Sequence, residues 1–187
     1  MSFLAKPYYA PDFNALVDET TVDSPTKKGL RIAFHTGTDS AWGGHVRQAF
    51  EFLRQHSSRR YSNNSLMRVL DLADYDFEDR PAPYIFRAEV PYEFDPISEV
   101  KTGGALGVMV QLNDGSSRAL LAVAPSHRRL GVATALLQAH LLTLGTPSMW
   151  VSSSNVVGQM FLLSQGLMPQ DFNARGVLRY GAENVDD

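Results

Sequence analysis

A short segment between an expected strand and an expected helix combines small residues with two arginines. Gly131 and Ala133 would let the backbone approach a ligand closely, because larger side chains would fill that space. The first amides of a helix have no partner within it, and the helix dipole adds partial positive charge there. With Arg128 and Arg129 beside them, these amides predict a seat for a phosphate or a pyrophosphate. A tight turn with two solvated arginines is the alternative.

Other chemistry-bearing patterns are incomplete. The chain has no cysteine, which excludes a disulfide, a thiolate metal site and a cysteine nucleophile. Its five histidines show no spacing typical of metal ligands, so we predict no metal centre. The strand, glycines and helix of residues 30–44 could suggest a nucleotide-phosphate enzyme, but the G-x-G-x-x-G spacing is missing. Trp42, Phe50 and Leu53 are therefore assigned to the core.

Periodicity and turn signals predict the elements that must position the arginine-containing segment. The expected strands are residues 30–35, 84–90, 105–112, 118–123, 148–152, 167–172 and 177–180. Helices are expected after a cap at Asp39 or Ser40, after a cap at residues 62–64, and over 131–144 and 155–165. The Asn-Asp-Gly turn at 113–115 marks the clearest hairpin. This order predicts an α/β (α+β) fold, a mixed sheet with helices on its faces.

The arginine-containing segment matches a known pattern. Its residues Val123, Pro125, Arg128, Gly131 and Ala133 resemble the pyrophosphate-binding motif V-x-P-x-x-[QR]-x-x-G-x-[GA]. That motif belongs to the GNAT superfamily of acyl-CoA-dependent N-acetyltransferases. The resemblance implies a GNAT-like fold, with a central mixed, mostly antiparallel sheet flanked by helices.

A second match lies downstream, at the distance usual in the family. Asn155, Gly158 and Phe161, followed by Gly166-Leu167, resemble the pattern N-x-x-[AG]-x-x-[FL] and its later G-[FL] pair. The resemblance is clearest over residues 117–167 and is compatible from residue 30 to the C-terminus.

The resemblance also implies how acetyl-CoA would be held. In this family the strand before the motif separates from its neighbour and binds the pantetheine arm, while the following amides bind the pyrophosphate. Asn155 would contact the pantetheine or hold the separated strand, as well as capping a helix. Phe161 would pack beside it or belong to the core. The cofactor-binding residues implied for this chain are Leu121, Ala122, Val123, Arg128, Arg129, Leu130, Gly131, Val132, Ala133, Thr134, Asn155 and Phe161.

The sequence departs from the family where catalytic residues usually lie. Many members have a glutamate six residues before the motif valine, which is Ser117 in this chain, or five residues before the asparagine, which is Trp150. The usual tyrosine acid, seven residues after the asparagine, is Leu162. Acetyl transfer needs a neutral amine, a polarised carbonyl and a proton for the thiolate. None of these three side chains titrates usefully, so the catalytic residues are unassigned.

Two explanations remain open. The enzyme could act chiefly by holding its reactants together, which can lower a barrier by ~7–11 kcal/mol. Base duty would then pass to water or to Glu89, Glu93 or His127. Glu89 is otherwise an exposed strand carboxylate, and His127 a solvated loop histidine that a bound phosphate would keep charged. Alternatively, the fold has lost its chemistry and only binds acyl-CoA or a partner.

Composition is that of an ordinary globular protein. The 187 residues are 44% hydrophobic and 20% charged, which excludes collagen-like, disordered and coiled-coil proteins. A formal charge of −3 argues against broad nucleic-acid binding. Residues 1–29 are proline-containing and lack a period, so we predict an N-terminal arm there and one GNAT domain over 30–187. The longest apolar stretch, 119–125, is far below the ~20 residues of a membrane helix, and we expect a cytoplasmic protein.

These features predict an N-acetyltransferase that takes acetyl-CoA as co-substrate and acetylates an amine of a small molecule or a protein. The acidic segments 71–79 and 89–95 would suit a cationic acceptor, although a solvated acidic surface is the plainer interpretation. A non-catalytic acyl-CoA-binding or protein-interaction module on the same fold is the alternative. A homodimer is left open, and neither a nucleic acid nor a membrane is expected as a partner.

Overall fold

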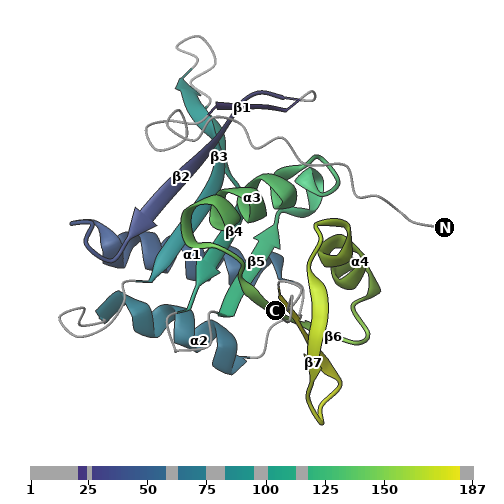
Figure 1. The fold of residues 1–187 in the computed structure, drawn as a ribbon. Coiled ribbons are helices and arrows are strands. Elements are labelled where there is room, and N and C mark those ends of the chain that lie inside the picture. The colour runs from purple at the N-terminus through teal and green to yellow at the C-terminus, as the bar shows by residue number, and fades with distance from the viewer. Residues whose placement is uncertain are drawn as a thin grey trace.

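The computed structural model describes residues 21–24, 27–57, 63–74, 83–94, 101–112 and 118–181, which form one eight-stranded sheet with helices on both faces (Figure 1). The strands are β1 (Thr21–Ser24), β2 (Lys27–Thr36), β3 (Tyr84–Phe94), β4 (Lys101–Gln111), β5 (Arg118–Val123), β6 (Ser148–Ser152), β7 (Met168–Phe172) and β8 (Val177–Gly181). The α-helices are α1 (Trp42–His56), α2 (Asn63–Asp71), α3 (Val132–Leu144) and α4 (Val156–Ser164). Two 3-10 turns are η2 (Leu72–Asp74) and η3 (Pro125–His127).

The sheet is mixed. Its strand order is β1-β2-β3-β4-β5-β6-β8-β7. Neighbouring strands are antiparallel except β5 and β6, which run parallel. A parallel pair needs a crossover connection, and α3 supplies it. The predicted mixed, mostly antiparallel sheet flanked by helices is therefore confirmed.

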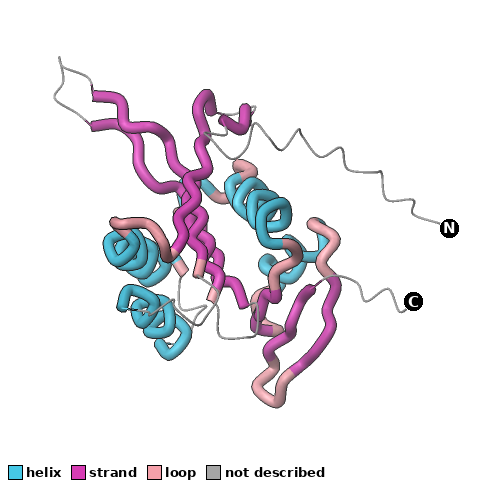
Figure 2. Tube along the Cα trace, turned by 60° about the vertical axis from the view of Figure 1, so that its left-hand side comes forward, coloured by secondary structure: helices cyan, strands magenta, loops and turns pink. Residues whose placement is uncertain are grey.

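Two apolar cores fill the spaces between the sheet and its helices. Figure 2 shows these helices on opposite sides of the sheet. α1 and α2 pack on one face of β3, β4 and β5, where Val46 and Leu53 are fully buried. α3 packs on the other face and is joined there by Leu162 of α4. As expected for a helix that is apolar nearly all round, α3 buries Leu136 and Leu137 completely. The first helix pair and α3 thus fix the central strands from both sides.

The C-terminal half follows the predicted elements closely. β4 and β5 form the expected hairpin, with Met109 opposite Leu121, while its turn at 113–115 lies outside the described residues. α3 ends at the predicted glycine, Gly145, whose φ is +80. β6 spans the predicted residues, and α4, β7 and β8 follow in the predicted order.

The N-terminal strands are longer than predicted. β2 begins at Lys27 rather than at Leu30, and β4 begins at Lys101 rather than at residue 105. β1 lies inside the segment predicted as an arm and pairs with β2, Val22 opposite Leu30. The sheet therefore extends into residues 21–29, where the sequence has no clear period. Residues 1–20 lie outside the described part of the chain, so their role as an arm stays a prediction.

The predicted side-chain cap of α1 is wrong. Ala41 occupies the N-cap position, without a capping side chain. Asp39 instead closes the preceding turn, because its Oδ2 accepts a hydrogen bond from the Thr36 amide at 3.0 Å. The helix start is fixed by packing: Trp42 is 4% exposed, and its Nε1 donates to the carbonyl oxygen of Leu72 at 2.7 Å.

α4 and the edge strand β7 expose an apolar surface. Its large exposed side chains are Val156, Val157, Met160, Leu163, Met168 and Phe172. Helix length is modest throughout: in the part of the chain that the structure describes, no helix combines the length and apolar character needed to cross a membrane.

One histidine is buried in the core beside the sheet. His140 of α3 is 1% exposed, with Nδ1 at 3.0 Å from the Gly145 carbonyl oxygen and Nε2 at 2.7 Å from Oε1 of Gln111. Its ring also lies 5.5 Å from that of Phe86. Burial lowers the pKa of His140 below its ordinary value of 6.5, and the hydrogen bond to Gly145 offsets only part of this shift.

Acid is therefore expected to destabilise the protein partly through His140. Because its pKa is lower in the folded state than in the unfolded state, the unfolded chain takes up the proton first as the pH falls below 6.5. The stabilisation is present above pH 6.5 and is lost as the pH falls towards the folded pKa, by at most about 1.4 kcal/mol per pH unit. Urea unfolding of the wild type and of His140→Gln between pH 8 and 5 measures the effect. A slope of stability against pH that is identical in the two proteins would contradict it.

Candidate functional site

β5 and β6 separate soon after they begin. Their parallel ladder joins two pairs of residues, Arg118 with Ser148 and Ala119 with Met149. β5 then continues to Val123, still paired with β4 on its other side. The ladder is therefore open along the last part of β5, which carries the residues predicted to bind the pantetheine arm: Leu121, Ala122 and Val123.

β5 leads into a loop that ends at the start of α3. The N-cap of α3 is Gly131, whose left-handed φ of +81 suits a residue without a Cβ. The Ala135 amide donates to the Gly131 carbonyl oxygen at 2.9 Å. The amides of the first turn, Val132, Ala133 and Thr134, thus precede the first intrahelical donor and point towards the loop. A Cβ added at Gly131 would meet no atom within 4 Å, so no other part of the described chain covers this residue at the start of the helix.

Arg128 holds the loop in place. Its Nε donates to the Val123 carbonyl oxygen at 3.2 Å, and its Nη2 donates to the His56 carbonyl oxygen at 3.1 Å. His56 is the last residue of α1, where a cation is favoured by the helix dipole. These contacts tie the loop to both β5 and α1. They favour a positioning role for Arg128 over the predicted direct contact with a phosphate.

Arg129 differs from its neighbour. Its side chain is exposed, and its φ of +64 is uncommon for a residue with a Cβ. Backbone conformations of this kind persist where the surroundings enforce them, and they concentrate at ligand sites. Arg129 therefore stays the better candidate of the two arginines for meeting an anion at the start of α3. Leu130, between Arg129 and Gly131, is half-buried.

Gly107 lets α3 lie close to the sheet at the site. It faces Val123 in the β4–β5 ladder. A Cβ at Gly107 would lie 2.9 Å from Cγ1 of Val132 and 3.0 Å from Cδ1 of Leu136, so these side chains or α3 would have to shift to admit it. Sequence reasoning placed this glycine inside a strand and did not assign it a role, although an isolated glycine in a strand is a signal of close approach.

The second motif forms the start of α4. Asn155 is the N-cap, and its Oδ1 accepts a hydrogen bond from the Gly158 amide at 3.1 Å. A Cβ at Gly158 would lie 2.5 Å from Nδ2 of Asn155, so the asparagine cap itself requires a glycine there. Phe161 is half-buried and packs against the core that α3 shares. The capping role of Asn155 is confirmed, while contact of Asn155 or Phe161 with a cofactor stays a prediction.

The described side chains at the family's usual catalytic positions make packing contacts. Leu162 is 2% exposed and belongs to the core. Trp150 is half-buried, faces Arg179 across the β6–β8 ladder, and has Cζ of Arg118 at 5.3 Å from its ring centroid. Ser117 lies outside the described residues.

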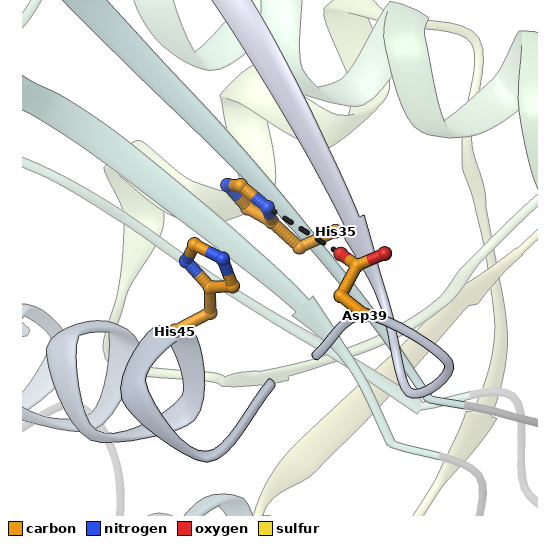
Figure 3. Close-up of side chains that lie close together, drawn as sticks. All are labelled: His35, Asp39 and His45. Atoms are coloured by element: carbon orange, nitrogen blue, oxygen red, sulfur yellow. Dashed lines mark ion pairs between the residues drawn. The ribbon is translucent and has the colours of Figure 1, made fainter. Parts of the chain in front are cut away.

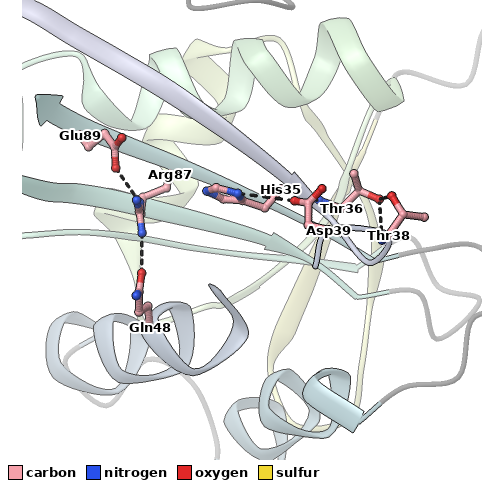
Figure 4. A network of polar contacts seen from close by, with 7 residues as sticks. All are labelled: His35, Thr36, Thr38, Asp39, Gln48, Arg87 and Glu89. Atoms are coloured by element: carbon pink, nitrogen blue, oxygen red, sulfur yellow. Dashed lines mark hydrogen bonds and ion pairs between the residues drawn. The ribbon is translucent and has the colours of Figure 1, made fainter. Parts of the chain in front are cut away.

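The alternative bases are also constrained. Glu89 is not the exposed carboxylate predicted: its side chain is 16% exposed, and its Oε2 accepts from Nε of Arg87 at 2.7 Å. Arg87 in turn donates to Gln48 of α1 at 2.5 Å, so Glu89 belongs to a network between β3 and α1 (Figure 4). His127 is half-buried, with Nδ1 at 2.8 Å from Oγ of Ser126. The side chain of Glu93 lies outside the part of the structure that is described.

The turn between β2 and α1 gathers a second group that spacing did not reveal. His35, Asp39 and His45 bring their donor atoms within 4.8 Å of one another (Figure 3). Burial, His45 and Arg87 lower the pKa of His35 from 6.5 to about 4. The two imidazoles stack, however, with centroids 3.6 Å apart and planes at 17°. An ion must lie near the plane of each coordinating ring, and nearly parallel planes do not meet close to the donors, so the present rotamers are packed rather than arranged for metal binding.

This histidine group is remote from the open ladder. β2 and β5 are three strands apart in the sheet, which corresponds to about 14 Å. The described site residues are instead gathered along β5, the start of α3 and the start of α4.

Comparisons with known proteins identify the family of folds to which this structure is similar. No family model matches the sequence, and no curated protein matches it. Among solved structures, the chain is similar to the GNAT domain of S. lividans PAT, with a TM-score of 0.52 and 14% identity, over 87% of this chain and 94% of that one. It is also similar to the PaiA N-acetyltransferase from Thermoplasma acidophilum in complex with coenzyme A, with a TM-score of 0.49 and 12% identity, over 81% and 98% of the two chains.

The likeness to the S. lividans domain extends over nearly the whole of both chains, and it agrees with the strand order and the crossover described above. The two motifs lie on the elements where the family pattern requires them, at the β5–α3 loop and at the start of α4. This protein therefore has the GNAT fold.

Proposed function

We propose that the protein is an N-acetyltransferase that transfers the acetyl group of acetyl-CoA to an amine. The observation that carries this proposal is the open β5–β6 ladder, which leads directly to the unobstructed start of α3. Strand backbone and helix amides are then available on one continuous path. A long ligand with amide groups at one end and a diphosphate at the other fits such a path.

Each part of the path has a defined role in the proposal. The backbone of Leu121, Ala122 and Val123 would pair with the pantetheine amides as a strand pairs with its neighbour. Amides from Arg129 to Thr134 would bind the pyrophosphate, which the dipole of α3 stabilises. Arg129 would add a full charge, and Arg128 would hold the loop in position.

The reaction balances without a redox step or a metal. The amine nitrogen forms a bond to the thioester carbonyl carbon, the carbon–sulfur bond breaks, the nitrogen loses a proton, and the thiolate takes one up. Glu89 is held by Arg87, and Leu162 is in the core, so the described residues favour positioning as the main contribution. Water would then carry the proton from the amine.

Two measurements on one preparation test the proposal. Calorimetric titration with coenzyme A should show saturable binding at one site, and acetyl-CoA with a panel of amines should release free thiol. Absence of coenzyme A binding by the folded protein would refute the proposal.

The second candidate is the non-catalytic module on the same fold. It is favoured by the absence of a titratable side chain at Trp150 and Leu162. Saturable binding of acetyl-CoA without thiol release across amines, peptides and lysate fractions would support this candidate against the enzyme. A homodimer stays a prediction.

A further inference from the structure

Buried polar atoms gather where β5 and β6 separate. Among the residues that the structure describes, six buried side-chain nitrogen and oxygen atoms have no hydrogen-bond partner. Four of them belong to one group, which we name the donor cluster: Nε of Arg118, Oγ of Ser148, Nε1 of Trp150 and Nε of Arg179. The other two belong to the histidine pair of the β2–α1 turn.

Strand register places the donor cluster on one face of the sheet. Arg118 lies beside Ser148 in the parallel β5–β6 ladder, and Trp150 lies opposite Arg179 in the β6–β8 ladder. Ser148 and Trp150 are two residues apart on β6, so their side chains share a face. Cζ of Arg118 lies 5.3 Å from the centroid of the Trp150 ring, so these two side chains of the cluster are in contact.

That face is the one covered by α1 and α2. Leu120 and Ala122 lie two and four residues after Arg118, so their side chains share its side of β5, and they belong to the core beneath those helices. That core includes no residue of β6 or β8, so the donor cluster lies at its border. The cluster is therefore next to the point at which the ladder opens.

The chemistry of the donor cluster is one-sided. Arginine Nε and tryptophan Nε1 can only donate a hydrogen bond, and a serine hydroxyl can donate as well. Buried donors in folded proteins nearly always have an acceptor, so a group without one needs an explanation such as a bound ligand. Both arginines are permanently charged. Asp171 lies opposite Arg179 in the β7–β8 ladder, but no ion pair joins either arginine to a carboxylate among the residues that the structure describes. An acceptor that carries negative charge would therefore suit this group of donors.

We propose that the donor cluster binds the carboxylate of a small acceptor molecule that also carries the amine to be acetylated. The inference rests on the proposed function, and it defines the substrate class as an amine that also bears a carboxylate, such as an amino acid. A carboxylate presents two coplanar oxygens, which match the planar donors of a guanidinium. Because the donor atoms are buried, a ligand must enter between these side chains to reach them, which suits a small molecule better than the surface of a folded protein.

This substrate class differs from the cationic acceptor that the acidic segments would suit. Glu89, one member of those segments, is already paired with Arg87 on β3. A polyamine at the donor cluster would instead meet two guanidinium groups of its own sign. The structure therefore favours an anionic amine over a cationic one.

Matched ligands provide the test. L-Phenylalanine and L-glutamate are each compared with their α-carboxamides, and spermidine and inorganic phosphate serve as further probes. Binding is followed by calorimetry with and without coenzyme A, and thiol release gives KM. We expect at least one amino acid to bind about 10-fold or more tightly than its carboxamide. Arg179→Gln and Trp150→Phe should reduce that preference.

The control makes the same arginine-to-glutamine substitution at a residue outside the donor cluster. Arg175→Gln removes an exposed arginine of the β7–β8 turn and should leave the preference unchanged. Coenzyme A affinity should be the same in the wild type and in Arg179→Gln. If the protein binds coenzyme A but binds each amino acid no more tightly than its carboxamide, or prefers spermidine or phosphate to both amino acids, this inference is overturned and the proposed function stands. If the folded wild type does not bind coenzyme A, the proposed function itself is overturned.

Discussion

Replacing Gly131 by glutamate is expected to lower the affinity for coenzyme A by about 100-fold or more. The substitution puts a carboxylate in the open space before α3, where it blocks the pyrophosphate sterically and repels it. Hydrogen bonds to a charged group contribute about 1.5–3 kcal/mol each, so loss of two already accounts for such a change. The wild type should gain ~2.7 kcal/mol of stability at coenzyme A concentrations of 100 times its Kd, and the variant at the same concentration should gain no more than ~0.4 kcal/mol. Thermal unfolding with and without coenzyme A measures both.

Two controls separate obstruction from backbone strain. Gly166→Glu introduces the same side chain at a second glycine with left-handed φ, +78, and open space, at the end of α4. It should cost similar stability, roughly 1–2 kcal/mol, and retain coenzyme A binding. Gly131→Ala strains the same residue without adding a charge and should retain most of the affinity. Full coenzyme A affinity in folded Gly131→Glu would show that the pyrophosphate binds elsewhere.

Replacing Gly107 by valine is expected to destabilise the protein by about 1–3 kcal/mol and to weaken coenzyme A binding as well. The Cβ alone would lie within 3.0 Å of side chains from Val132 and Leu136, and 3.2 Å from the carbonyl oxygen of Ala122. Val132 and Leu136 are buried, so α3 must move away from β4 to make room. Because Val132 is the first residue of α3, this movement shifts the amides that the pyrophosphate would contact.

The same substitution at Gly44 is the matched control. Gly44 lies in α1, and a Cβ there would meet no atom within 4 Å. Gly44→Val should change the free energy of unfolding by less than about 0.5 kcal/mol and leave coenzyme A affinity as it was. Chemical unfolding and calorimetry on the three proteins decide the matter. If Gly107→Val matched Gly44→Val in both measurements, the close approach of α3 to β4 would not be what positions the site.

Sequence patterns were most informative where local signals decide structure. The β4–β5 hairpin, α3 and the Asn155 cap were all predicted, because a turn, a continuous apolar helix and a cap are each encoded within a few residues. The loop residues of the expected pyrophosphate site follow from the same local pattern. Strand ends in the N-terminal half were not predicted, because β1 and the start of β2 owe their structure to pairing rather than to periodicity.

Roles that depend on distant partners could not be predicted. The contact of Arg128 with the last carbonyl of α1 joins residues 72 positions apart. Glu89 is linked to Gln48 of α1 through Arg87, and the histidine group depends on the turn between β2 and α1. Arg118 reaches the Trp150 ring, and Arg179 lies opposite Trp150, only because β6 lies between β5 and β8 in the sheet. Such contacts belong to the topology, which a single sequence does not specify residue by residue.

The open ladder between β5 and β6 would affect how long the folded protein survives. Only two residue pairs of the described chain join these strands, so an extended ligand bound between them would add the hydrogen bonds of a missing strand and stabilise the sheet. Copies made while that ligand is scarce would open there more often and be cut sooner by proteases. If the ligand is acetyl-CoA, as proposed above, the abundance of the protein would follow the supply of acetyl-CoA.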